Sequence, residues 1–167
     1  MTQEVQRNYL EINSIQDLKK VIKLNGDYSL DLLEPINFQL NKFFYKNIGK
    51  NHRWIDRLVW TEKQWIEYVS DKNVKTYVLK NENDIAGYFE LNLHPQKDEV
   101  EIAYLGLLKE YHNKKLGSYL LSVAIKNSFL NKPKRVWAHT CSLDHKNALN
   151  NYIARGMKIF KTETVFL

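Results

Sequence analysis

One stretch of this chain, EVEIAYLGLLKEYHNKKLGS at residues 99–118, constrains the fold more than any other. Residues 100–108 are apolar and predict a strand, residues 109–111 predict a short charged turn, and a helix follows. The apolar residues of that helix recur at i, i+4, i+7 and i+8: Leu116, Leu120, Val123 and Ala124. This spacing is typical of a helix that packs one face against a sheet.

A strand, a positively charged turn and a helix N-terminus together predict an anion site. The N–H groups of a first helical turn have no partner within the helix, and the helix dipole favours negative charge there. Three polar residues of the turn, His112, Asn113 and Lys114, supply further donors, as does Lys115. Gly117 lets a ligand approach the backbone closely. We therefore expect a phosphate or pyrophosphate group at this position.

The segment YHNKKLGSYLL resembles the coenzyme A loop of the GNAT superfamily of N-acetyltransferases. The signature of that loop is Arg or Gln, two residues, Gly, one residue, then Gly or Ala. His112 stands at the Arg/Gln position, Lys115 at the first Gly position and Gly117 at the second. This loop departs from the signature at two of its three positions, so the context of the loop matters.

A second segment, DHKNALNNYIARGM, resembles the other GNAT landmark. That landmark is commonly Asn, two residues, Ala, three residues, Tyr, three residues and Gly-Phe. Ala148, Tyr152 and Gly156 match it, while His145 stands at the Asn position and Met157 at the Phe position. The two segments follow one another in the family's order.

The resemblance implies a single α/β domain over residues 1–167 with the GNAT fold, a mixed and mostly antiparallel central sheet flanked by helices. Residues 74–167 would form the acetyl-coenzyme A-binding core, and residues 1–73 the acceptor-side helices and first strand. The pattern predicts strands at residues 4–13, 76–81, 88–94, 134–141 and 158–167. It predicts helices at residues 15–24, 36–50, 61–71 and 142–156, the last capped by Ser142 or Asp144.

The resemblance also implies acetyl transfer from acetyl-coenzyme A to a primary amine. Glu101 is the predicted general base, because it lies in an apolar strand eleven positions before His112, the spacing found in the histone-acetylating branch. Glu99 and Glu90 are the reserve candidates. Tyr152 stands where the family often carries the acid that protonates the departing sulfur. The predicted cofactor-binding residues are Leu107, Leu108, His112, Asn113, Lys114, Lys115, Leu116, Gly117, Ser118 and His145.

The acceptor side is crowded with aromatic residues between positions 38 and 68. Core packing explains them, and so does the wall of an acceptor pocket. For the second interpretation the predicted substrate-binding residues are Tyr45, Trp54, Arg57 and Glu90, with an arginine reaching an acceptor carboxylate. The acceptor itself, a small-molecule amine or a peptide or protein amine, stays open.

Composition limits the partners. The net charge of +6 is the single argument for nucleic-acid binding, and no basic stripe or known module supports it, so we expect no nucleic acid. No apolar run is long enough for a membrane span and no signal peptide is evident, so we expect a cytoplasmic protein, with a homodimer left open.

Residues 139–145 contain four possible metal ligands. His139, Cys141, Asp144 and His145 have a spacing that could suggest zinc, but no second paired motif accompanies them, so we expect no metal. A non-catalytic module that binds or senses acyl-coenzyme A is the alternative function, because the loop residues are replaced.

Overall fold

The computed structural model describes residues 2–21 and 26–167 of the chain. Its strands form one sheet in the order β2-β3-β4-β5-β6-β1-β7. The strands are β1 (Glu4–Ile12), β2 (Tyr28–Leu32), β3 (Val74–Asn81), β4 (Asp84–His94), β5 (Glu99–Leu107), β6 (Arg135–Cys141) and β7 (Lys158–Phe166). The α-helices are α1 (Phe38–Gly49), α2 (Glu62–Ser70), α3 (Leu116–Ser128) and α4 (Ala148–Ala154), with short 3₁₀ turns at Ile15–Asp17, Lys109–Tyr111 and Phe129–Asn131.

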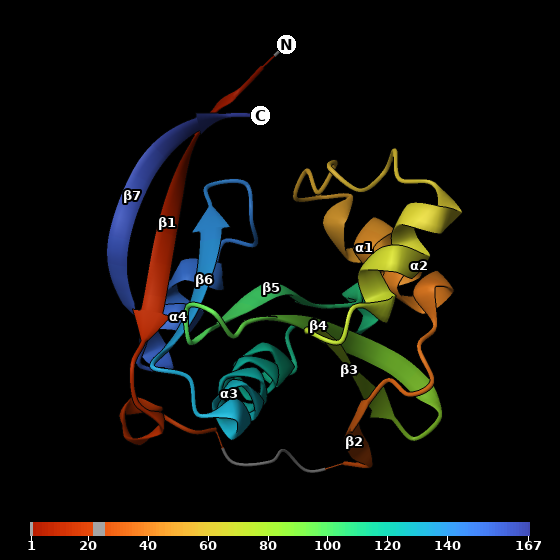
Figure 1. Ribbon diagram of the computed structural model, residues 1–167, viewed down its shortest axis with the longest axis horizontal. Coiled ribbons are helices and arrows are strands. Elements are labelled where there is room, and N and C mark those ends of the chain that lie inside the picture. The colour runs from red at the N-terminus through yellow and green to blue at the C-terminus, as the bar shows by residue number, and fades with distance from the viewer. Residues whose placement is uncertain (1, 22–25) are drawn as a thin grey trace.

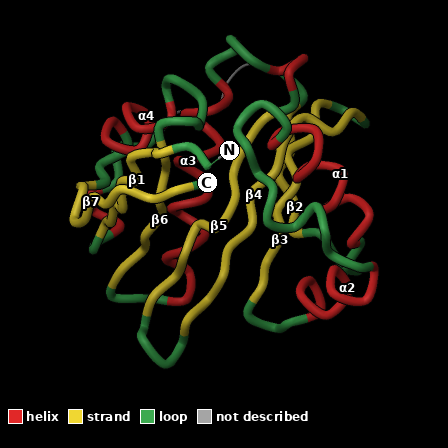
Figure 2. The backbone as a smooth tube through the Cα atoms, turned by 90° about the horizontal axis from the view of Figure 1, so that it is seen from above, coloured by secondary structure: helices red, strands yellow, loops and turns green. Residues whose placement is uncertain are grey.

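Helices cover the sheet on both faces (Figures 1 and 2). Helices α1 and α2 lie over the β3–β4 half on one face, and α3 packs across β4 and β5 on the other, beside α4. Neighbouring strands are antiparallel, except for β5 and β6, which are parallel. The predicted mixed, mostly antiparallel α/β architecture is therefore confirmed.

The apolar stripe of α3 forms the larger core with the sheet. Leu116, Leu120 and Ala124 are fully buried among residues of β1, β4, β5 and β6. A smaller core lies under α1, where the rings of Phe44 and Tyr88 stack with centroids 4.7 Å apart. Burial of this apolar surface is the main favourable contribution to folding.

Local signals set the start of the acceptor-side helices. The predicted capping box at α2 is present: the Thr61 hydroxyl accepts from the Gln64 N–H, and the Gln64 side chain accepts from the Thr61 N–H. At α1 the Asn37 side chain accepts from the Leu40 N–H. Both caps satisfy N–H groups that a helix leaves free.

The helix predicted over residues 15–24 is wrong. Only Ile15–Asp17 form a 3₁₀ turn, and residues 22–25 lie outside the described residues. Tertiary partners take the backbone groups that a helix would use: the Lys19 N–H donates to the Arg155 carbonyl, and the Val21 N–H to the Ser122 hydroxyl. The helical spacing of this segment therefore reflects burial at Leu18, not a helix.

The helix predicted over residues 142–156 is present only as the shorter α4, Ala148–Ala154. Asp144 does not cap it. Its Oδ2 atom instead accepts from the Thr140 hydroxyl at 2.6 Å and from the Cys141 N–H at 2.9 Å, which closes a turn after β6. This turn places residues 142–147 after the C-terminal end of β6 and not in a helix.

Strand β1 lies between β6 and β7, antiparallel to both. The first strand of the chain therefore completes the half of the sheet formed by the C-terminal strands, and the two described chain ends lie close together (Figure 1). This pairing brings Arg7 opposite Cys141 and Tyr9 opposite His139.

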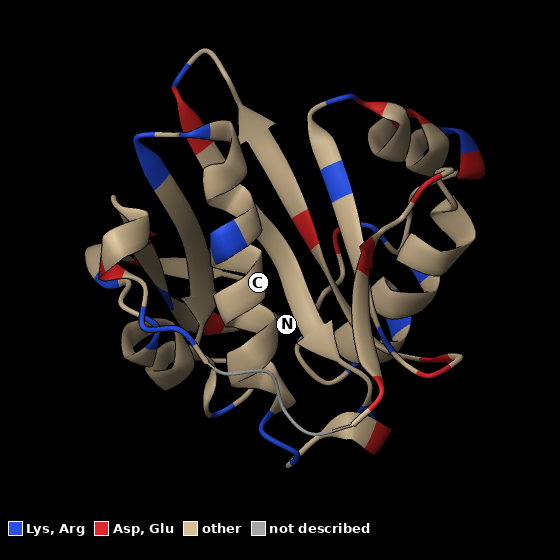
Figure 3. Ribbon diagram, turned by 90° about the horizontal axis from the view of Figure 1, so that it is seen from below, with Lys and Arg blue, Asp and Glu red and all other residues tan. Residues whose placement is uncertain are grey.

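Charged residues are spread over the molecule (Figure 3). Seen from below, Lys and Arg occupy separate loops, a strand and a helix in place of one continuous stripe. Among the described residues, no helix combines the length and the apolar character needed to cross a membrane.

Candidate active site

The site begins where β5 and β6 separate. Their parallel pairing covers only Glu99–Arg135 to Glu101–Trp137. On the other side of β5 the register with β4 shifts, because Glu90 pairs with Tyr104 and Leu91 with Ile102. The extra residue, at position 103, marks a bulge, which bends a strand locally. The C-terminal halves of the two parallel strands therefore diverge.

A cavity of about 550 Å³ lies between the diverging strands. Residues 103–107 of β5 form one wall and residues 139–141 of β6 the other. The N-terminus of α3, the start of α4 and the segment between α1 and α2 complete it. A cavity of this size, with mixed apolar and polar walls, is typical of a small-molecule site.

The N-terminus of α3 forms the polar end of the cavity. Asn113 and Lys115 both adopt the left-handed backbone conformation, with φ of 61°. Lys115 is the N-cap of α3, and no side chain caps the helix. Left-handed residues beside a helix start turn successive N–H groups to one side and favour anion binding. Lys115 stands at the first glycine position of the predicted coenzyme A loop. Its backbone has the left-handed conformation that glycine adopts readily.

Asn151 and Tyr152 of α4 face this end from the opposite side. The Asn151 amide donates to the Gly117 carbonyl at 3.2 Å, and its Oδ1 atom is buried without a hydrogen-bond partner within the described residues. Tyr152 lines the cavity. Burial, and to a smaller extent the charge of Asp144, raises the pKa of the Tyr152 hydroxyl, so it stays protonated at neutral pH.

The backbone at the end of β5 directs one N–H group toward the cavity. The Leu108 N–H donates to the Ala86 carbonyl of β4 at 2.8 Å. Successive strand residues present their N–H groups to opposite edges, so the Leu107 N–H is directed toward the diverging β6. The Leu107 carbonyl, on the same edge, contacts the His112 Nε2 atom at 3.1 Å.

Most residues predicted for the site line this cavity. They are Tyr45, Trp54, Leu107, His112, Asn113, Lys115, Leu116, Gly117, Ser118, His145 and Tyr152. The cavity wall does not include Leu108, Lys114, Arg57, Glu90 or Glu101. The structure therefore brings together the predicted cofactor loop, the predicted acid and two acceptor-side aromatics, and it leaves the predicted base outside the wall.

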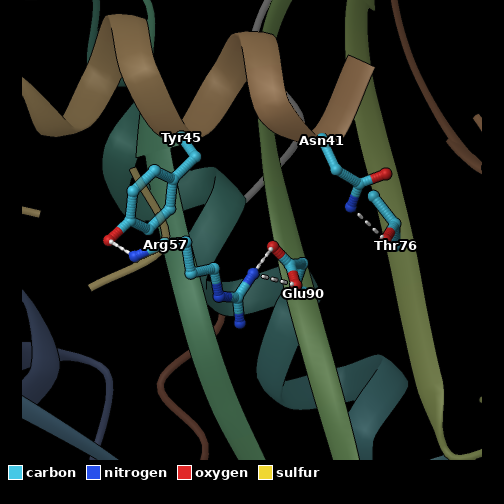
Figure 4. A network of polar contacts seen from close by, with 5 residues as sticks. All are labelled: Asn41, Tyr45, Arg57, Thr76 and Glu90. Atoms are coloured by element: carbon cyan, nitrogen blue, oxygen red, sulfur yellow. Dashed lines mark hydrogen bonds and ion pairs between the residues drawn. The ribbon is translucent and has the colours of Figure 1, made fainter. Parts of the chain in front are cut away.

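Arg57 and Glu90 form a buried ion pair behind the cavity (Figure 4). The Arg57 Nη1 atom lies 3.0 Å and 3.1 Å from the two Glu90 carboxylate oxygens. The guanidinium carbon is 4.1 Å from the Tyr68 ring centroid and 4.4 Å from that of Tyr104. Burial opposes the Arg57 charge, but Glu90 holds the pKa of Arg57 above its ordinary value. Because Glu90 already neutralises Arg57, an acceptor carboxylate would have to displace it.

The two carboxylates of β5 have protein partners. The Glu101 Oε2 atom lies 3.3 Å from the His94 Nε2 atom, and the Glu99 Oε1 atom lies 3.0 Å from Arg135. The Glu101 side chain is 18% exposed. The catalytic role of either residue stays a prediction.

The sequence prediction missed further cavity-lining residues, among them Arg7, His52, His139 and Asn151. Arg7 and His139 meet there only because β1 pairs with β6, which no local pattern indicates. The His145 ring lies 5.7 Å from that of His112 and 6.4 Å from that of His52, between centroids. No group of three or more His, Cys, Asp or Glu within the described residues is arranged to hold a metal ion.

The arrangement defines a class of protein: a mixed α/β domain whose ligand cavity opens where two central parallel strands diverge, closed at one end by a helix N-terminus. A model of the acetyltransferase (GNAT) family matches residues 36–157. The chain belongs to the GNAT acetyltransferase family.

Solved structures share the fold at low sequence identity. A GCN5-related N-acetyltransferase from Sphaerobacter thermophilus has a TM-score of 0.72 and 12% identity, over 99% of this chain and 51% of that one. One from Kribbella flavida has a TM-score of 0.67 and 12% identity, over 96% and 56%. An aminoglycoside acetyltransferase from an uncultured soil metagenomic sample has a TM-score of 0.65 and 13% identity, over 77% and 87%.

The chain spans about half of the Sphaerobacter and Kribbella structures. No curated protein matched the chain in the sequence comparison. At these identities the solved structures show the fold, and the family match shows membership of the GNAT acetyltransferase family.

Proposed function

We propose that the protein transfers the acetyl group of acetyl-coenzyme A to a primary amine of a small molecule, peptide or protein. The observation that carries the proposal is the cavity between β5 and β6, which joins an uncapped helix N-terminus to the protonated Tyr152. The family match supports acyl transfer.

The residues at the polar end fit coenzyme A. The free N–H groups of the first turn of α3, with Lys115, suit a pyrophosphate, and Lys114 adds charge nearby. The unpartnered Asn151 Oδ1 atom can accept from an amide N–H of the bound molecule. Bound acetyl-coenzyme A would supply an acetyl thioester, whose carbonyl carbon an amine can attack.

The chain's own groups would assist that attack. The Leu107 N–H, directed into the gap between the strands, would donate to the carbonyl oxygen as negative charge develops on it. Tyr152 would give its hydroxyl proton to the departing sulfur. Glu101 is the predicted base, but it lies outside the cavity wall, so a proton from an amine in the cavity needs an intermediary to reach it.

The acceptor end is formed by Tyr45, Trp54 and Tyr104, with Asp56 beside them. An aromatic wall with one carboxylate suits a cationic amine. Because one structural neighbour is an aminoglycoside acetyltransferase, aminoglycosides belong in the panel of acceptors to be tested, together with amino acids, polyamines and peptides. A cytoplasmic location, and action without nucleic acid or membrane, stay predictions.

A thermal-shift titration with acetyl-coenzyme A, coenzyme A and ATP, followed by thiol release against the amine panel, tests the proposal. A ligand that binds the folded state raises the unfolding midpoint. We expect both coenzyme A species to raise it, and thiol release with one amine class. The double variant Lys114→Glu/Lys115→Glu should lose the coenzyme A shift while its unliganded midpoint stays near that of the wild type.

The other outcomes of this experiment distinguish the transferase from a non-catalytic binding protein. Stabilisation without thiol release for any amine would support the alternative, a non-catalytic acyl-coenzyme A-binding module. The replaced loop residues His112 and Lys115 are the observation that favours this alternative. No stabilisation by either coenzyme A species would contradict both functions.

A further inference from the structure

We propose that His139 accepts the proton of the acceptor amine and that Glu101 acts through it. This inference rests on the proposed function. His139 lies on β6 two residues beyond Trp137, the last residue that pairs with β5. It is exposed and lines the cavity, across from the β5 wall formed by residues 103–107.

The His139 ring differs from the other histidine rings in its hydrogen bonds. The other four each have one ring nitrogen bound: His52 to the Leu143 carbonyl at 3.0 Å, His94 to Glu101 at 3.3 Å, His112 to the Leu107 carbonyl at 3.1 Å, and His145 to the Asn147 N–H at 3.2 Å. Within the described part of the chain, His139 has no such bond. Both of its ring nitrogens are therefore free to exchange a proton with a bound amine.

Charged and aromatic groups from several elements surround His139. They are Arg7 and Tyr9 on β1, Glu101 on β5, Asp144 after β6 and Glu163 on β7. The surrounding protein lowers the pKa of His139 below 6.5, and Arg7 lowers it further, while the three carboxylates oppose this. At pH 7 the imidazole is neutral and can accept a proton.

Four other titratable groups near the diverging strands are protonated. Burial raises the pKa values of Tyr45, Tyr104 and Tyr152, and that of the Cys141 thiol. None of these four can accept a proton at neutral pH. The Asp144 carboxylate is occupied by the Thr140 hydroxyl and the Cys141 N–H.

Glu101 is then a positioning residue. Its carboxylate lies outside the cavity wall, and its negative charge raises the pKa of His139, which means that it stabilises the imidazolium formed after proton transfer. This explains how a carboxylate held by His94 can contribute without touching the amine.

Protons and electrons balance across the proposed reaction. His139 takes one proton from the ammonium group and releases it to water. The nitrogen lone pair then forms the N–C bond to the thioester carbonyl carbon, the second nitrogen proton passes to His139, and the C–S bond breaks with its electron pair on sulfur. Tyr152 protonates the sulfur and is reprotonated through water by His139. Ammonium and thioester give amide, thiol and one released proton.

Two substitutions test the role directly. His139→Gln should lower kcat/KM at pH 7 by about 100-fold or more, the usual contribution of a general base, and leave the coenzyme A thermal shift unchanged. His139→Ala should behave alike and recover activity when free imidazole is added, because the ring position is open to the cavity. Glu67→Gln, at an exposed position of α2 outside the cavity wall, is the control and should change kcat/KM less than threefold.

The pH profile separates this role from a structural one. Wild-type kcat/KM should fall as pH drops through the lowered pKa of His139. Arg7→Gln removes a charge that lowers this pKa, so the acid limb should move to higher pH. Glu101→Gln removes a charge that raises it, so the limb should move to lower pH while turnover at pH 7 persists.

The opposite pattern overturns the inference. If Glu101→Gln abolishes turnover and His139→Gln does not, Glu101 is the base itself. If His139→Gln loses the coenzyme A shift along with activity, His139 serves cofactor binding. A wild-type protein that binds coenzyme A but acetylates no amine overturns the proposed function and this role with it, and the wild-type arm detects that before any variant is compared.

Discussion

At the scale of single residues, the buried ion pair between Arg57 and Glu90 explains why the first half of the chain contains so many aromatic residues. Tyr45 hydrogen-bonds the Arg57 N–H, and the Arg57 guanidinium contacts aromatic rings around it. Tyr45 is fully buried and also contributes to the cavity wall, while its contact with an acceptor stays a prediction. The ion pair lies behind the proposed acceptor end.

Breaking this pair should destabilise the fold. Glu90→Gln leaves the Arg57 charge buried without compensation, and we expect the free energy of unfolding to fall by about 3–5 kcal/mol. Urea unfolding followed by tryptophan fluorescence measures it. Glu67→Gln, in the exposed pair with Lys63 whose side chains are 85% and 64% exposed, is the control and should leave the midpoint unchanged. Equal midpoints for both variants would contradict a buried, paired Arg57.

Two glycines of the cavity should respond differently to an added methyl group. At Gly106 a Cβ atom would lie 2.5 Å from the Ile48 Cγ2 atom, so Gly106→Ala should cost about 1–3 kcal/mol of stability. At Gly117 the nearest atom would be Leu107 Cδ1 at 3.9 Å, an ordinary contact, so Gly117→Ala should unfold at the wild-type midpoint. It should still weaken the coenzyme A thermal shift, because Gly117 lines the cavity. An undiminished shift would place the pyrophosphate elsewhere.

At the scale of elements, the best predictions came from segments whose partners are close in sequence. Residues 99–118 contain their own strand, turn and helix, and the α2 capping box lies within four residues, so both were found. The segment after Ser14 was misread because Lys19 and Val21 hydrogen-bond to groups more than a hundred residues away. The predicted cofactor loop is local, and its strand, turn and helix are present. The pairing that places Arg7 and His139 in the site was not local and was missed.

At the scale of the whole molecule, β1 holds the C-terminal half of the sheet together. Asn8 pairs with Thr140 of β6 on one side and Thr162 of β7 on the other. Within the described residues, strand β7 pairs only with β1, so β1 connects it to the rest of the sheet. Strand β2, at the opposite edge, connects no further strand to the sheet. A substitution that disrupts β1 should therefore destabilise more of the sheet than one that disrupts β2.

A proline in each strand tests this. Asn8→Pro removes a backbone donor between two neighbouring strands and should cost about 3 kcal/mol or more. Hydrogen exchange of residues 158–166 should accelerate along with that of residues 135–141. Ser29→Pro in the edge strand β2 is the matched control and should speed exchange only near β2 and β3. If β7 stays protected in Asn8→Pro, it is held by contacts other than β1.

The place of β1 also bears on how the protein is made. Strand β1 is translated before both of its neighbours, Arg135–Cys141 and Lys158–Phe166. About 120 residues separate β1 from β6, and at ordinary rates of synthesis they take roughly six to twenty-five seconds, during which the apolar residues of β1 have no neighbouring strand. These residues stay unpaired until β6 has been translated, and that interval is when we expect chaperones to bind the nascent chain.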